Sequence, residues 1–217
     1  MRDFELVIFD CDGVVVDSEV LSCRCLSEVL GRHGVPVGLE EVFDRFLGRS
    51  FAAVEEHFLK IRGVPASDQF RADLNAHLAA AFRASLRPMP HVEAVLAGLD
   101  RPYCLASSSH AERIRLTLAV TGLAHHFGGR VFDAAMVARG KPAPDLFLHV
   151  ADKMGARAAL TLVIEDSVTG VQAGKAAGMT VWGFTGGCHY ADRDAGAALA
   201  AAGADRVFVS MTEFTAY

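Results

Sequence analysis

Two aspartates, Asp10 and Asp12, follow directly on the apolar run Leu6–Phe9 and precede Gly13. If the run is a buried strand, side chains two residues apart point to the same side, so both carboxylates could face one ligand. Carboxylates that close repel each other, and a hard cation such as Mg²⁺ relieves the repulsion. One carboxylate could then act as a nucleophile and the other as a general acid/base. A strand followed by an Asp-Gly turn, with no chemistry, is the alternative.

A run of serines, Ser107, Ser108 and Ser109, ends a second apolar segment, 103–106, and precedes a predicted helix near His110. Small hydroxyls and free backbone N–H groups at a helix N-terminus can bind an anion. Serines that only cap the helix are the alternative.

Lys141 and two acids form the remaining polar segments. Lys141 lies in G-K-P-A-P-D at 140–145, where the glycine and prolines restrict the backbone; a solvated surface lysine is the alternative. Glu165 and Asp166 end the apolar run 160–164 and supply oxygen donors that hard cations prefer. Acids that favour a helix N-terminus are the alternative. If these segments end successive parallel strands, they meet at the sheet edge where α/β proteins bind ligands.

The elements that must position these residues alternate along the chain. We expect strands at 6–9, 103–106, 131–132, 160–164, 181–184 and 206–209, and helices at 110–121, 144–154, 168–178 and 192–202. The strands are short and nearly uniformly apolar, as in a parallel sheet covered on both faces. This alternation predicts an α/β fold with a doubly wound, Rossmann-like parallel sheet.

One long segment interrupts the alternation. Helical periodicity alone runs through it, with helices expected near 18–33, 39–47, 50–61 and 67–84. Such a segment is too long for a simple crossover. We therefore expect a catalytic core at 1–16 and 87–217 and an inserted helical cap at 17–86, which acts as a lid because it follows the aspartates directly.

Substrate choice should come from this insert. Arg24, Gly48, Arg49 and Ser50 are the candidates, and an arginine there could pair with a carboxylate or a second anionic group. A solvated arginine at a helix end is the alternative for each arginine.

Composition limits the partners. The chain has 217 residues, 52% of them hydrophobic, and its net charge of −5 is unlike the basic domains that bind nucleic acid. No apolar run is long enough for a membrane span, and the N-terminus does not resemble a signal peptide. Five cysteines is an odd number for a disulfide framework. We expect a cytoplasmic monomer or weak homodimer, with His125, His126 and His189 on its surface rather than in metal sites.

The four segments together resemble the motifs of the haloacid dehalogenase superfamily, in its phosphatase and β-phosphoglucomutase-like branch with a small helical cap. The matching segments are F-D-C-D-G-V-V-V-D-S-E at 9–19, A-S-S-S at 106–109, G-K-P-A-P-D at 140–145 and V-I-E-D-S-V-T-G-V-Q-A-G at 163–174. Within that branch, E-E-V-F-D-R-F-L-G at 40–48 adds a likeness to bacterial sugar-phosphate phosphatases of the 6-phosphogluconate type. The likeness covers essentially the whole chain.

The resemblance implies a role for each motif. Asp10 would be the nucleophile and Asp12 the acid/base. Ser107, the Ser108 backbone and Lys141 would bind the phosphoryl group. Asp10, Asp12, Glu165 and Asp166 would serve Mg²⁺. The expected activity is Mg²⁺-dependent hydrolysis of a small phosphorylated metabolite, a sugar or sugar-acid phosphate, through an aspartyl-phosphate.

Two other functions stay open from the sequence, a phosphosugar mutase and a non-enzymatic protein that binds phosphorylated metabolites. Relatives with mutase activity carry a cap histidine shortly after the first motif, where this chain has Ser22. This difference favours the hydrolase, and Ser22 joins the candidates for substrate specificity.

Overall fold

The computed structural model describes residues 4–48, 51–191 and 194–214. The chain folds into two compact units. One unit contains Met1–Asp17 and Arg87–Tyr217, and the other is Ser18–Leu86. The first holds the sheet and the second is helical. Within the described residues, no helix is both long enough and apolar enough to cross a membrane.

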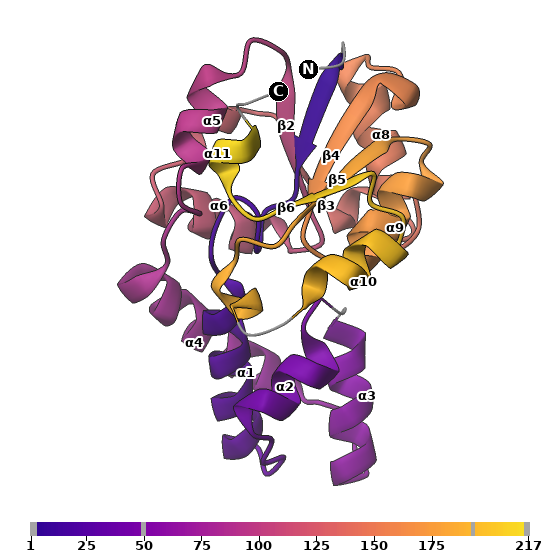
Figure 1. Cartoon of the computed structure of the whole chain (residues 1–217). Helices are drawn as coiled ribbons and strands as arrows, with labels where there is room; N and C mark the ends of the chain where they lie inside the picture. Colours follow the sequence, from indigo (N-terminus) through magenta and orange to yellow (C-terminus); the bar gives the residue numbers. More distant parts are fainter. Residues whose placement is uncertain (1–3, 49–50, 192–193, 215–217) are drawn as a thin grey trace. The chain divides into compact units, whose positions relative to one another are not determined.

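The first unit is built on a parallel sheet of six strands among the residues described (Figure 1). Its strands are β1 Leu6–Phe9, β2 Tyr103–Ser107, β3 Val131–Asp133, β4 Thr161–Glu165, β5 Thr180–Phe184 and β6 Arg206–Phe208. The order β3-β2-β1-β4-β5-β6 places β1 in the middle, with the chain winding outward to both edges. Each expected strand is present within one residue at either end, and the predicted α/β doubly wound fold is confirmed.

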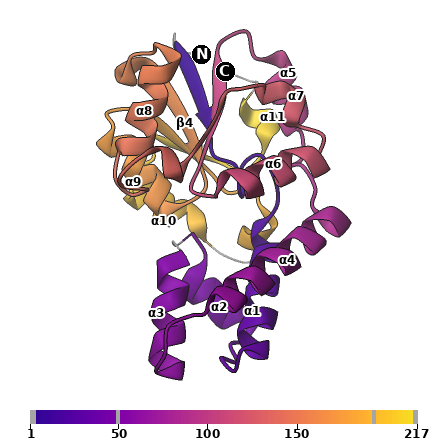
Figure 2. The same ribbon diagram turned by 180° about the vertical axis from the view of Figure 1, so that it is seen from behind.

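Helices cover both faces of this sheet, as Figures 1 and 2 show from opposite sides. On one face lie α8 Asp145–Met154, α9 Val168–Ala176 and α10 Ala195–Ala201. On the other lie α5 Val92–Gly98, α6 Ala111–Val120, α7 Ala124–Phe127 and α11 Met211–Phe214. Three single turns, η1 Ala134–Met136, η2 Ala158–Leu160 and η3 Cys188–Tyr190, lie in loops.

The central strand β1 contributes to the core on both faces, which explains its uninterrupted apolar sequence. Leu6 and Ile8 belong to the cluster formed with α8, α9 and α10. Phe9 points the other way, where its ring lies 5.9 Å from that of Phe214 in α11. All four residues of β1 are fully buried, so the strand fixes the position of Asp10, the residue that follows it.

The helical unit contains α1 Glu19–Arg32, α2 Leu39–Phe46, α3 Phe51–Arg62 and α4 Asp68–Ser85. These bounds lie within one residue of those expected from the periodicity. The unit has its own core, in which the Phe70 ring lies 5.1 Å from that of Phe58. Breaks between helices occur at Gly34 and Gly63, both with the positive φ that glycine adopts at least cost.

Candidate active site

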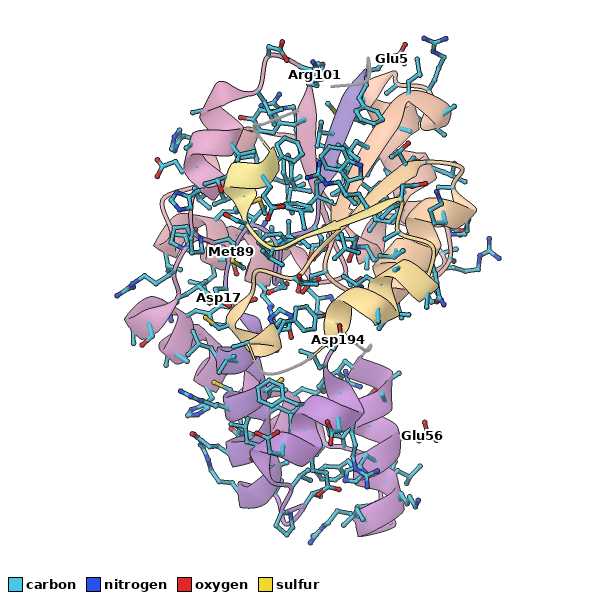
Figure 3. The ribbon with its side chains drawn as sticks, in the orientation of Figure 1. Glu5, Asp17, Glu56, Met89, Arg101 and Asp194 are labelled. Carbon is cyan, nitrogen blue, oxygen red and sulfur yellow. The ribbon has the colours of Figure 1, made fainter. Side chains whose placement is uncertain are left out.

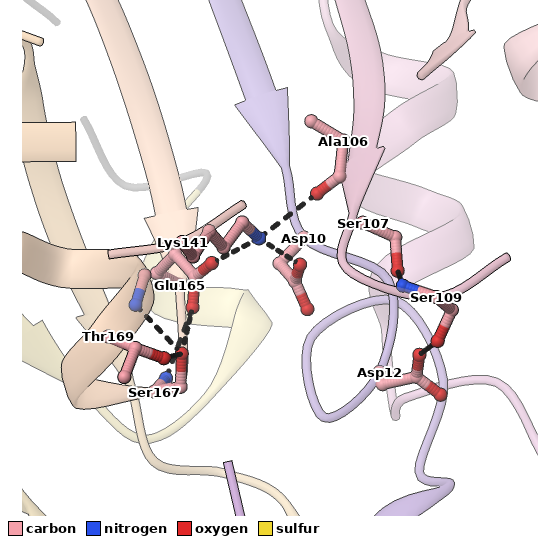
Figure 4. A network of polar contacts seen from close by, with 10 residues as sticks. Asp10, Asp12, Ala106, Ser107, Ser109, Lys141, Glu165, Ser167 and Thr169 are labelled. Atoms are coloured by element: carbon pink, nitrogen blue, oxygen red, sulfur yellow. Dashed lines mark hydrogen bonds and ion pairs between the residues drawn. The ribbon is translucent and has the colours of Figure 1, made fainter. Parts of the chain in front are cut away.

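Polar residues that follow three strands meet at one edge of the sheet (Figure 4). Asp10 comes directly after β1, Ser107 ends β2 and Glu165 ends β4. The strand register aligns these ends, because Phe9 pairs with Leu105 of β2 and with Ile164 of β4. This is the carboxyl edge at which parallel α/β sheets bind ligands.

Lys141 lies at the centre of this group. Its Nζ donates to Asp10 Oδ1 at 2.5 Å, to Glu165 Oε1 at 2.6 Å and to the Ala106 carbonyl at 3.3 Å. Only 4% of the side chain is exposed, so the alternative of a solvated surface lysine is wrong. Burial by itself would lower the pKa of Lys141, but the charges of Asp10 and Glu165 outweigh it and raise that pKa, which keeps the ammonium charged.

Three buried acids surround the lysine: Asp10, Glu165 and Asp166. One oxygen of each lies within 4.8 Å of the others. Burial, together with the neighbouring carboxylates, raises the pKa of Asp10 and of Asp166 well above the usual range. When all three acids are ionised, three carboxylates and one ammonium leave two negative charges unbalanced, and one divalent cation would neutralise them. The hard oxygen donors and this charge deficit fit a hard divalent cation.

Glu165 also has a structural task. Its Oε1 accepts from Lys141, and its Oε2 accepts from the backbone N–H and the hydroxyl of Ser167, the N-cap of α9. A Cβ at Gly170 would lie 1.9 Å from Glu165 Cδ, so only glycine fits there. The alternative role, an acid at a helix N-terminus, therefore describes one oxygen of Glu165, and its role toward a cation stays a prediction. With both oxygens engaged, it holds Lys141 and α9 in place, while Asp10 and Asp166 are better placed to receive a cation.

Asp12 has hydrogen-bond partners other than those of Asp10. The strand ends at Phe9, so strand alternation does not by itself fix the direction of these two side chains, and whether both face one ligand stays a prediction. Asp12 instead accepts from Ser109 Oγ at 2.7 Å and from Arg113 Nη2 at 2.8 Å, beside the acid cluster (Figure 4).

Arg113 also belongs to this site, although it lies in none of the four polar segments of the sequence. It lies in the first turn of α6, where the helix dipole disfavours a positive charge. That unfavourable placement is a signal that the arginine has an acidic partner elsewhere in the fold.

The three serines are not helix caps. Helix α6 begins after His110, whose side chain makes no capping hydrogen bond. Ser107 is buried and its Oγ accepts from the Ser109 N–H at 3.0 Å, whereas Ser108 is exposed. The capping alternative is therefore wrong, and the serines form a turn over the end of β2.

His189 is not on the surface, contrary to expectation. It is buried, and its Nε2 lies 3.3 Å from Asp166 Oδ2. The rings of His125 and His126 lie 4.1 Å apart in α7, and together with Glu93 they have ligand atoms within 4.8 Å of one another. The sequence indicated neither arrangement, because His189 and Glu93 are distant in sequence from the residues they approach.

The specificity candidates lie in the helical unit. Ser22 Oγ, in α1, donates to the carbonyl of Ser18, the N-cap of that helix, at 2.8 Å. Arg24 and Gly48 are exposed, and Gly48 has a φ of 67°. Arg49 and Ser50 lie outside the described residues. The roles of all five in substrate choice remain predictions.

Known proteins resemble this chain along most of its length. A family model described as a haloacid dehalogenase-like hydrolase matches residues 4–178. The chain is 30% identical to the 6-phosphogluconate phosphatase of Escherichia coli K12 over 194 residues, which are 87% of this chain and 86% of that protein. It is 31% identical to the fructose-1-phosphate phosphatase of the same organism over 183 residues, which are 80% of this chain and 92% of that protein.

A solved structure gives the same result. The crystal structure of a haloacid dehalogenase family hydrolase from Deinococcus radiodurans R1, with bound phosphate and sodium, superposes with a TM-score of 0.80 at 34% identity, covering 100% of this chain and 95% of that one. The predicted resemblance is therefore confirmed, and the chain belongs to the haloacid dehalogenase-like hydrolase family.

Proposed function

We propose that the chain is a Mg²⁺-dependent phosphomonoester hydrolase that acts on a small sugar or sugar-acid phosphate through an aspartyl-phosphate on Asp10. The observation that carries the proposal is the buried group in which Lys141 holds Asp10 beside Glu165 and Asp166. The relatives named as 6-phosphogluconate and fructose-1-phosphate phosphatases support the choice of substrate class.

Binding of the phosphoryl group requires positive charge and donors at the carboxyl edge. Lys141 supplies the charge, and its bond to Asp10 Oδ1 orients the nucleophilic carboxylate. The turn of Ser107 and Ser108 offers hydroxyl and backbone N–H donors to the phosphoryl oxygens. Asp10, Asp166 and the Asp12 backbone carbonyl would hold Mg²⁺, which when bound offsets the repulsion between carboxylate and phosphate.

The reaction then proceeds in two halves. Asp10 attacks phosphorus, the ester oxygen leaves with a proton from Asp12, and an aspartyl-phosphate remains. Asp12 next takes a proton from the water that attacks this intermediate, which releases phosphate and restores Asp10. Ser109 and Arg113 both donate to Asp12 and so hold its carboxylate in place for these proton transfers. We further propose that the helical unit, Ser18–Leu86, acts as the cap that sets specificity, and that the protein works in the cytoplasm, in keeping with its five free cysteines.

A screen of phosphorylated metabolites tests the proposal. Hexose phosphates and sugar-acid phosphates would be incubated with the protein and Mg²⁺, and released phosphate measured, with Asp10→Asn as the control. Phosphate should appear with the wild type and not with the variant. Absence of phosphate release from every substrate by the wild-type protein would contradict the proposal.

Ser22 supports hydrolysis over the mutase reaction. Its hydroxyl donates to its own helix, and a serine offers no group that titrates near neutral pH to control the acid/base. Free phosphate should therefore appear in step with substrate loss when the reaction is followed by NMR. An isomeric sugar phosphate that accumulates without comparable phosphate release would establish the mutase instead.

A further inference from the structure

The segment Thr185–Ala191, which follows β5, contacts Asp166 at two points. Tyr190 Oη donates to the Asp166 backbone carbonyl at 2.6 Å. His189 Nε2 lies 3.3 Å from Asp166 Oδ2. One residue of the segment thus holds the backbone of Asp166, and its neighbour faces the carboxylate.

The His189 ring occupies a space that two glycines leave open. Only 1% of the side chain is exposed. A Cβ at Gly187 would lie 2.5 Å from His189 Cε1, and a Cβ at Gly13 would lie 3.3 Å from the same atom and 1.8 Å from Asp166 Oδ2. The ring also packs against Tyr190, with centroids 3.8 Å apart. Gly13, Asp166, Gly187 and His189 therefore fit together closely, and the carboxylate has little freedom to rotate.

The segment Thr185–Ala191 also forms a hydrogen bond with Asp17 of the sheet unit. The backbone N–H of Cys188 donates to Asp17 Oδ1 at 3.2 Å. Figure 3 labels Asp17, which is the last residue of this unit before the helical one. This bond gives the segment an anchor that does not depend on Asp166.

We propose that His189 and Tyr190 are positioning residues that hold Asp166 in the orientation needed to bind the catalytic cation. The proposal rests on the proposed function only in taking Asp166 as a ligand of that cation. Residues that contact a metal-binding side chain orient that side chain for the metal, and their mutation typically lowers metal affinity 10- to 100-fold. A buried polar ring is costly unless a polar partner faces it, and here that partner is a carboxylate of the acid cluster.

Mn²⁺ binding to the full-length protein without substrate tests the proposal, with free Mn²⁺ measured by electron paramagnetic resonance. We expect Tyr190→Phe and His189→Leu each to raise the dissociation constant about 10- to 100-fold. His189→Gln, which keeps a polar donor, should recover part of the affinity. His149→Leu is the matched control, because His149 lies in α8 against Phe132, and it should bind Mn²⁺ as the wild type does.

Folding of each variant would be checked by circular dichroism. If His189→Leu does not fold, Tyr190→Phe still decides, since it removes a single hydroxyl. Wild-type Mn²⁺ affinity in folded Tyr190→Phe and His189→Leu would overturn the proposal while leaving the phosphatase function intact. Conversely, a wild-type protein that binds Mn²⁺ but hydrolyses no phosphate ester would refute the function and leave the positioning role standing.

Discussion

Replacing Lys141 by methionine isolates the charge balance of the buried acid cluster. Methionine has a similar length and is apolar, so it can pack beside Phe147, whose ring lies 5.0 Å from Nζ. The change leaves Asp10 and Glu165 without their cation, at a site where all three side chains are nine-tenths or more buried. Removal of one partner from a buried ion pair typically costs about 3–5 kcal/mol of the free energy of unfolding.

The loss should depend on pH in a defined direction. The pKa of Asp10 and that of Asp166 are raised in the folded state, mainly by burial. Their contribution to stability is therefore fully present below the pKa that these two acids have in the unfolded chain, near pH 4. It is lost as the pH rises through the pKa that they have in the folded protein. Lys141 opposes that loss, so its removal should cost more stability at pH 8 than at pH 5.

Urea denaturation in metal-free buffer would measure both effects, with Lys175→Met as the matched control. Lys175 pairs with Asp205, but 35% of its side chain and 42% of that of Asp205 are exposed. Such surface pairs contribute about 0–1 kcal/mol. Equal losses of the free energy of unfolding in the two variants at pH 8 would refute this charge balance. A larger loss in Lys141→Met at pH 5 than at pH 8 would refute it as well.

Three further predictions concern the reaction. Asp10→Asn should remove turnover and leave the circular dichroism spectrum unchanged, and a variant with a tenth of wild-type activity would exclude a covalent role. Chelation by EDTA should abolish phosphate release and Mg²⁺ should restore it, whereas Ca²⁺, which takes more ligands at longer distances, should inhibit; full activity after exhaustive chelation would be the contrary result. Arg113→Gln should lower kcat about tenfold or more by leaving the Asp12 carboxylate less well held. The control is Arg157→Gln, because Arg157 pairs with Glu5 at the opposite edge of the sheet (Figure 3 labels Glu5). Equal effects of the two substitutions on kcat would contradict a specific role for Arg113.

The sequence predicted those parts of the molecule that repeat a simple pattern. The apolar run at 6–9 is a buried strand, as expected, and residues at the ends of such runs meet at one edge because the sheet is parallel. The short helices α5, α7 and α11 were missed, since four to seven residues give too little periodicity to recognise.

Contacts that depend on loop paths could not be predicted either. Asp12 lies beyond the end of β1, where no regular alternation fixes the direction of a side chain. Its partner Arg113 is 101 residues away, and Tyr190 is 24 residues from Asp166. Periodicity carries no information about such pairs, although an arginine in the first turn of a helix was a usable signal.

The central place of β1 has a consequence for how the chain is made. One of its two neighbours, β4, begins at Thr161, about 155 residues after Leu6 of β1, so β1 is synthesised well before it. At 5–20 residues per second, the fully apolar strand waits roughly 8–30 s for that partner. Helices α1 to α4 lie within one compact unit, Ser18–Leu86, whose residues are all synthesised before β4, so this unit can form during the wait. We therefore expect the inserted unit to fold before the sheet is complete, and the unpaired edge of β1 to be open to aggregation until β4 is synthesised.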